Sequence, residues 1–163
     1  MKNDNLILLS DRQNCTQVDV NKKIIDISID TLSRTLWGEA RGEGTVGMRA
    51  VASVIWNRYK ISKGRNGYWW GNDIVSICHK PYQFSCWNRS DPNYKRLMAV
   101  DIQDRQFRSA KDIARLTIEG QMYDLTGGAT HYHAKNIKPY WSNGQAPTKT
   151  IGNHIFYNLE NSP

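Results

Sequence analysis

The apolar residues of this chain change their spacing near Gly127, and this change limits the folds that the chain can adopt. In three segments, residues 32–40, 51–59 and 110–117, inward-facing side chains recur every three or four positions, which is the period of one helix face. Residues 129–134 and 153–157 instead alternate in the way that strands do. The sequence therefore predicts an α+β domain that is mostly helical and carries a small antiparallel sheet near its C-terminal end.

Capping residues and glycines suggest where the predicted helices begin and end. The first begins near Asp30, whose side chain can cap the first turn, and it stops at Gly42. A second opens at Gly44, and a third starts at Ser109 and ends at Gly120. Their inner faces are Leu32, Leu36 and Ala40, then Val51, Val54, Ile55 and Tyr59, then Ala110, Ile113, Ala114 and Thr117.

The length of 163 residues fits one domain that buries its own core. An apolar fraction of 39% excludes a disordered chain. We expect residues 30–163 to form this domain and residues 1–29, which are polar and mixed, to be an extended arm packed on it. No internal repeat is visible, and we also expect a monomer.

The chain is basic, with 22 Lys and Arg against 15 Asp and Glu and a net charge of +7. This charge favours polyanionic partners, among which nucleic acid, an acidic membrane surface and the bacterial envelope all qualify. The N-terminal apolar run, residues 6–9, is too short for a secretory signal or a membrane span. We therefore expect synthesis in the cytoplasm without a signal peptide, and no integral membrane segment.

Three cysteines, Cys15, Cys78 and Cys86, cannot form a closed set of disulfides. A bridge between Cys78 and Cys86 is open in an oxidising space, but free, partly buried thiols are the simpler expectation. The chain has no Cys-x-x-Cys pair, which excludes a four-thiolate zinc site.

Glu39 projects from the apolar side of the first predicted helix. At about 100° per residue it points in nearly the same direction as Leu32 and Leu36. A carboxyl group placed there is partly desolvated, which favours its protonated form and suits a general acid. A semi-buried ion pair with Arg34 or Arg58 would explain the same placement, and helix phase alone does not separate the two.

Four blocks of sequence follow one another in an order that carries a family resemblance. They are Trp37–Gly44 continued by Gly47 and Ala50–Arg58, then Pro81–Trp87, then Thr126–His133, and then Thr150–Tyr157. In this order they resemble the cell-wall hydrolase family typified by the spore-cortex-lytic enzyme of germination. The resemblance spans roughly residues 32–157, which is nearly the whole domain.

The resemblance implies a lysozyme-like fold related to goose-type lysozyme and lytic transglycosylases. It implies cleavage of peptidoglycan glycan strands between N-acetylmuramic acid and N-acetylglucosamine, with Glu39 as the catalytic acid. Glu43, the other acid in the blocks, is expected to cap the next helix or to act as an accessory group. Because a lytic transglycosylase needs one acid to form a 1,6-anhydro ring, we favour it over a hydrolytic muramidase. No cofactor, metal ion or nucleic acid is expected.

The N-terminal sequence and the resemblance together raise the question of delivery. A compact wall hydrolase without a signal peptide suits a phage endolysin. Such an enzyme is released through a holin pore and acts on the cell wall in the periplasm. We state this route as a hypothesis.

Further side chains in the blocks are candidates for binding sugars. Gln83 and Ser85 carry groups that hydrogen-bond to sugar hydroxyls, and aromatic rings at Tyr82 or Trp87 offer stacking surfaces. Phe84 and Trp87 are equally compatible with the core. The predicted binding residues are Gln83, Phe84, Ser85, Trp87, His131, Tyr132, His133 and Tyr157.

Two rival functions remain open at this level. His131 and His133 share one strand face, and with His154 they have a spacing usable for zinc, as in an amidase that cuts the muramoyl–alanine bond. A non-catalytic wall-binding module is the other rival. Its basis is the basic loop with Lys63 and Arg65 beside the aromatic run 68–70.

Overall fold

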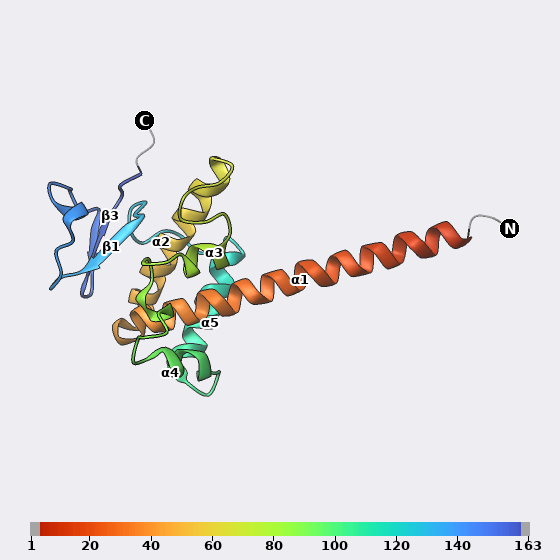
Figure 1. Ribbon diagram of the computed structural model, residues 1–163, viewed down its shortest axis with the longest axis horizontal. Helices are drawn as coiled ribbons and strands as arrows, with labels where there is room; N and C mark the ends of the chain where they lie inside the picture. The colour runs from red at the N-terminus through yellow and green to blue at the C-terminus, as the bar shows by residue number, and fades with distance from the viewer. Residues whose placement is uncertain (1–3, 161–163) are drawn as a thin grey trace.

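The computed structural model describes the backbone of residues 4–160 and the side chains of residues 16–160. Helices form one layer and a small sheet lies beside them (Figure 1). The helical elements are α1 (Asp4–Ala40), η1 (Arg41–Glu43), α2 (Gly44–Gly64), α3 (Ile74–His79), η2 (Ser85–Trp87), α4 (Tyr94–Ala99), α5 (Arg105–Ile118) and η3 (Tyr140–Ser142). The predicted α+β class, mostly helical with a small antiparallel sheet, is confirmed.

The main core forms where the second half of α1 packs against α2, α3 and α5. The predicted inner faces are buried: Leu32 and Leu36 of α1 are fully enclosed, as are Val51 and Ile55 of α2. Trp70, from the loop after α2, is fully buried in the same core, and its indole N–H donates to a backbone carbonyl of α2. This core holds the C-terminal end of α1, and with it Glu39, in a fixed position.

The sheet consists of three antiparallel strands in the order β1-β3-β2, with β1 at His131–Ala134, β2 at Lys149–Ile151 and β3 at His154–Tyr157. The sequence predicted the strands β1 and β3, and their antiparallel pairing is confirmed. It did not predict β2, which spans only three residues. Phe156 of β3 packs on Ala50 and Val54 of α2 and thereby docks the sheet on the helices.

Residues 4–29 differ from the predicted extended arm, since they are the first part of a single 37-residue helix, α1. Figure 1 shows this part of α1 projecting away from the domain. The side chains of residues 16–27 are exposed, including Val18, Ile24 and Ile25. Asp30 therefore lies within a helix rather than at its start, and its carboxylate accepts from Arg34 one turn later.

Because the first part of α1 is exposed, we expect the domain to fold stably without it. Deleting residues 1–26 should lower the free energy of unfolding by less than about 1 kcal/mol, because none of the described side chains removed is buried. Deleting residues 1–33 should cost more than about 3 kcal/mol, because it removes the fully buried Leu32. Urea denaturation measures both values, and a large loss from the shorter deletion would contradict the boundary.

The start of α5 corrects a second prediction. The helix begins at Arg105 rather than Ser109, because the Asp104 carboxylate caps it by accepting from the Phe107 N–H at 2.9 Å. Cys78 and Cys86 are free and buried, as expected for thiols without a bridge. Within the described residues, no helix has the length and apolar character needed to cross a membrane.

Candidate active site

A cleft of about 580 Å³ opens where the end of α1 meets strand β1 and the loops around it. Its walls combine charged, amide, hydroxyl and aromatic groups, which can bind a ligand through both hydrogen bonds and apolar contacts. The lining residues are Glu39, Arg58, Trp69, Tyr82, Gln83, Ser85, Asn88, His131, Tyr132, Ile137 and Trp141. Glu39 is the single acid among them, so proton transfer by a carboxyl group in this cleft depends on it.

Two donors from different elements hold the Glu39 carboxylate. The backbone N–H of Cys86 in η2 donates to Oε1 at 3.1 Å, and the Tyr132 hydroxyl of β1 donates to Oε2 at 3.1 Å. Among the described residues, no arginine forms an ion pair with Glu39; Arg34 pairs with Asp30. The structural ion pair considered from the sequence is therefore wrong, and the carboxylate faces the cleft.

Gly38 allows the segment carrying Cys86 to approach α1 this closely. A Cβ on Gly38 would lie 2.6 Å from the Cys86 Cβ and 2.9 Å from its Sγ, which is closer than real atoms come. Burial raises the pKa of the Cys86 thiol, and the nearby Glu39 charge raises it further. The thiol therefore stays neutral and serves as packing against the helix.

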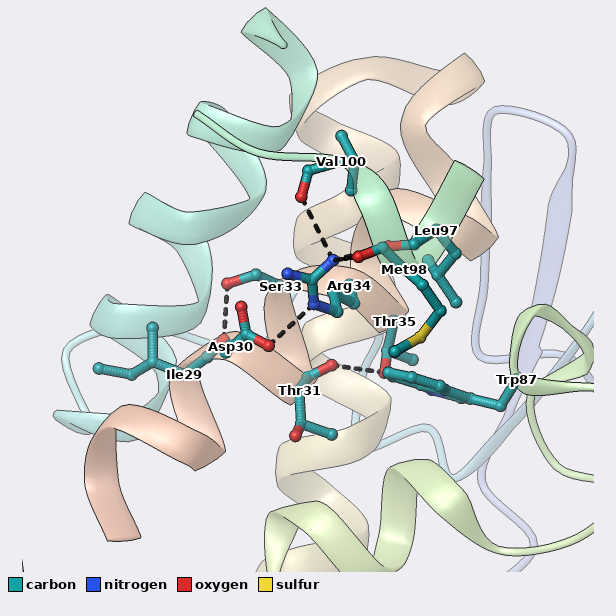
Figure 2. A network of polar contacts seen from close by, with 10 residues as sticks. All are labelled: Ile29, Asp30, Thr31, Ser33, Arg34, Thr35, Trp87, Leu97, Met98 and Val100. Carbon is teal, nitrogen blue, oxygen red and sulfur yellow. Dashed lines mark hydrogen bonds and ion pairs between the residues drawn. The ribbon is translucent and has the colours of Figure 1, made fainter. Parts of the chain in front are cut away.

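The outer side of α1 anchors the other loops near the site (Figure 2). The Arg34 guanidinium donates to the Leu97 carbonyl at 2.6 Å and to two further carbonyls at the end of α4. The Trp87 indole N–H donates to the Thr35 hydroxyl at 3.0 Å. These bonds fix η2 and α4 against α1 and so fix the Cys86 N–H that holds Glu39.

Arg58 is a buried residue of the cleft lining and was missed as a site residue. Its guanidinium donates to the Thr130 carbonyl at 2.8 Å and to the Gln83 side-chain oxygen at 3.0 Å. Burial lowers its pKa to about 10, so it stays positively charged at neutral pH. Arg58 thus orients Gln83 and holds the start of β1.

Two side chains of β1 have shifted pKa values that keep them neutral. Burial, with the adjacent Glu39 charge, raises the pKa of Tyr132 well above its ordinary value, so the phenol remains a donor. Burial and the Arg58 charge lower the pKa of His131 to about 4. The cleft therefore presents a neutral imidazole at neutral pH.

The low pKa of His131 predicts that acid destabilises the fold. An unfolded histidine gains a proton near pH 6.5, but folded His131 does so only near pH 4. The unfolded state binds more protons between these values, so stability falls as the pH drops through this range. Because the ring is partly exposed and screened by solvent, we expect a loss of about 1–2 kcal/mol.

Urea denaturation at neutral pH and near pH 4 measures this loss. The His131→Asn variant should lose less stability between the two conditions, because it lacks the titrating group. An equal loss in both proteins would contradict the role of His131.

The predicted binding residues divide into two groups. Gln83, Ser85, His131 and Tyr132 line the cleft. Phe84 is buried in the core. The Trp87 indole N–H donates to the Thr35 hydroxyl, and its ring packs against the ring of His79. His133 and Tyr157 do not line this cleft either: they stack on each other and share a hydrogen bond of 3.1 Å.

Glu43 lies outside the lining of the cleft and has a structural contact instead. Its carboxylate accepts from the Asn153 N–H at 2.7 Å, at the turn between β2 and β3. Gly152 makes room for it, since a Cβ there would collide with the Glu43 carboxylate. The Glu43 side chain makes no capping hydrogen bond to α2, so the predicted cap is wrong. The Glu43 carboxylate instead connects the β2–β3 hairpin to the helices.

The strand register separates the three histidines that were considered as zinc ligands. His131 and His133 point to one face of the sheet, whereas His154 is paired with Ala134 and packs its ring on Tyr132, on the opposite face. Within the part of the chain that the structure describes, no three His, Cys, Asp or Glu side chains are placed to hold a metal ion.

The basic loop beside the aromatic run is largely engaged in packing. Arg65 pairs with Glu160 at 3.1 Å and lies over the Tyr68 ring, and Trp70 is fully buried. Only Trp69 of this run lines the cleft. Asn88, Ile137 and Trp141 also line it and were missed; Trp141 alone offered a signal, as an aromatic residue in a loop rich in proline and glycine.

Known proteins share both this fold and this sequence pattern. The catalytic domain of the germination-specific lytic transglycosylase SleB from Bacillus anthracis matches with a TM-score of 0.61 and 25% identity, over 80% of this chain and 93% of that one. The SleB catalytic domain from Bacillus cereus gives the same TM-score and identity, over 80% and 89%.

Sequence comparison agrees with the structural match. The spore cortex-lytic enzyme of Halalkalibacterium halodurans is 29% identical over 139 residues, which cover 82% of this chain. They cover 35% of that relative, so the chain spans about a third of its length. A family model described as Cell Wall Hydrolase matches residues 42–157. The chain therefore belongs to the cell wall hydrolase family.

Proposed function

We propose that this protein cleaves the bond between N-acetylmuramic acid and N-acetylglucosamine in peptidoglycan as a lytic transglycosylase. The observation that supports this most is the isolation of Glu39, the single acid in the lining of an aromatic cleft, held by the Cys86 N–H and the Tyr132 hydroxyl. The relatives named as lytic enzymes support the same substrate class.

One carboxyl group accounts for the whole reaction. Protonated Glu39 donates its proton to the glycosidic oxygen as the bond to the muramic acid C1 breaks. The Glu39 carboxylate then accepts the proton of the muramic acid 6-hydroxyl as its oxygen bonds to C1. A 1,6-anhydro ring forms, and no water is consumed. A hydrolytic muramidase would require a base for water, and a second carboxylate is absent from the lining residues.

Digestion of purified peptidoglycan tests the class of bond. We expect turbidity to fall without new N-terminal alanine amines, and we expect activity to survive a strong chelator. New alanine amines would indicate an amidase, and binding without loss of turbidity would indicate a wall-binding module. Delivery as a phage endolysin through a holin pore stays a prediction.

A further inference from the structure

The turn at residues 80–83 carries a tyrosine where its geometry favours glycine. The Gln83 N–H donates to the Lys80 carbonyl at 3.1 Å and closes a turn with Pro81 second and Tyr82 third. Tyr82 has φ +67°, in the left-handed region. A turn with proline second and a positive φ third usually places Gly or Asn there, because a Cβ is strained in this conformation. The chain thus maintains local strain at Tyr82.

The side chain of Tyr82 offers the fold no compensation for this strain. It is 97% exposed, and within the described residues it makes no hydrogen bond, ring contact or cation contact. The other described non-glycine residue with positive φ is Asn66, a residue type that tolerates it. Strain maintained without structural benefit is typical of a functional position.

The position of Tyr82 indicates what this function is. Tyr82 lines the cleft together with Trp69, from the loop after α2, and Trp141 of η3. The turn leads directly into Gln83, which faces the cleft, and into Cys86, whose N–H holds Glu39. Aromatic rings bind saccharides by stacking on the apolar face of a sugar ring.

Resting on the proposed function, we propose that Tyr82 is a sugar-binding platform that holds one saccharide ring of the glycan strand at the mouth of the cleft. The left-handed backbone aims the phenol ring into solvent, where a long polymer passes. Replacing Tyr82 with a residue that suits this turn would stabilise the protein and weaken its binding to the glycan.

Three variants separate a platform from a structural residue. Tyr82→Asn and Tyr82→Gly suit the turn and lack the ring, so we expect Tm to rise by about 2–4 °C and KM to rise roughly tenfold with kcat nearly unchanged. Tyr82→Phe keeps the stacking surface and should keep both Tm and KM. Tyr140→Asn is the matched control, because Tyr140 is 91% exposed and does not line the cleft; it should leave KM and Tm unchanged.

The measurements are thermal unfolding and initial rates on soluble glycan strands. Wild-type KM in Tyr82→Asn and Tyr82→Gly, or a raised KM in Tyr82→Phe, would overturn the platform while leaving the proposed function intact. A wild-type protein that cleaves no glycan would instead defeat the proposed function and, with it, the platform.

Discussion

Glu39→Gln is expected to reduce glycan cleavage by about 10³-fold or more, because the variant has no proton to give to the leaving oxygen and no carboxylate to take one back. The amide should fit the same space, since its oxygen can accept from the Cys86 N–H and the Tyr132 hydroxyl can rotate to accept from the amide N–H. Tm should therefore stay close to that of the wild type.

Two controls accompany this variant. Glu119→Gln changes an exposed acid at the end of α5, outside the cleft, and should keep full activity. Glu43→Gln retains an oxygen that can accept from the Asn153 N–H and should keep activity within about tenfold of the wild type. If Glu43→Gln were as inactive as Glu39→Gln, a single-acid mechanism would be wrong.

Gly38→Ala is expected to reduce activity by about 100-fold and to lower the free energy of unfolding by about 1–3 kcal/mol. The new Cβ would lie 2.6 Å from the Cys86 Cβ and 3.2 Å from the Leu97 Cδ1. The segment at Cys86 must then move, and with it the N–H that orients Glu39. Initial rates and urea denaturation measure the two effects.

The chain offers a matched control and a rescue for this substitution. Gly42→Ala adds the same methyl group where no atom lies within 4 Å, so stability and activity should be retained. Adding Cys86→Gly to Gly38→Ala removes the Cys86 Cβ and Sγ, the two atoms closer than 3.0 Å to the new Cβ, and should restore part of the activity. A Gly38→Ala variant as active as the wild type would show that this close approach does not position Glu39.

The helix and strand periods were sufficient to predict the class of fold. Leu32, Leu36, Val51 and Ile55 are buried as predicted, because a core face repeats every three or four residues. The helix N-terminal to Asp30 was missed, since the side chains of residues 16–27 are exposed and show no one-sided pattern. The three-residue strand β2 is likewise too short to show alternation.

The candidate site was less predictable because its residues meet only in three dimensions. The placement of Glu39 in the cleft followed from helix phase and from the sequence blocks together. The sequence placed His154 with His131 and His133, but the register of β1 with β3 puts it on the other face. Arg58 was weighed as a partner of Glu39, whereas it donates to Thr130 and Gln83, which lie far from it in the sequence.

Mass spectrometry of the glycan fragments tests the central claim most directly. Peptidoglycan digested in water labelled with heavy oxygen should yield muramic acid ends that are one water lighter than reducing ends and carry no label. These ends should be absent from the Glu39→Gln digest. Labelled reducing ends produced by the wild type would contradict transglycosylation by Glu39 and indicate a hydrolytic muramidase.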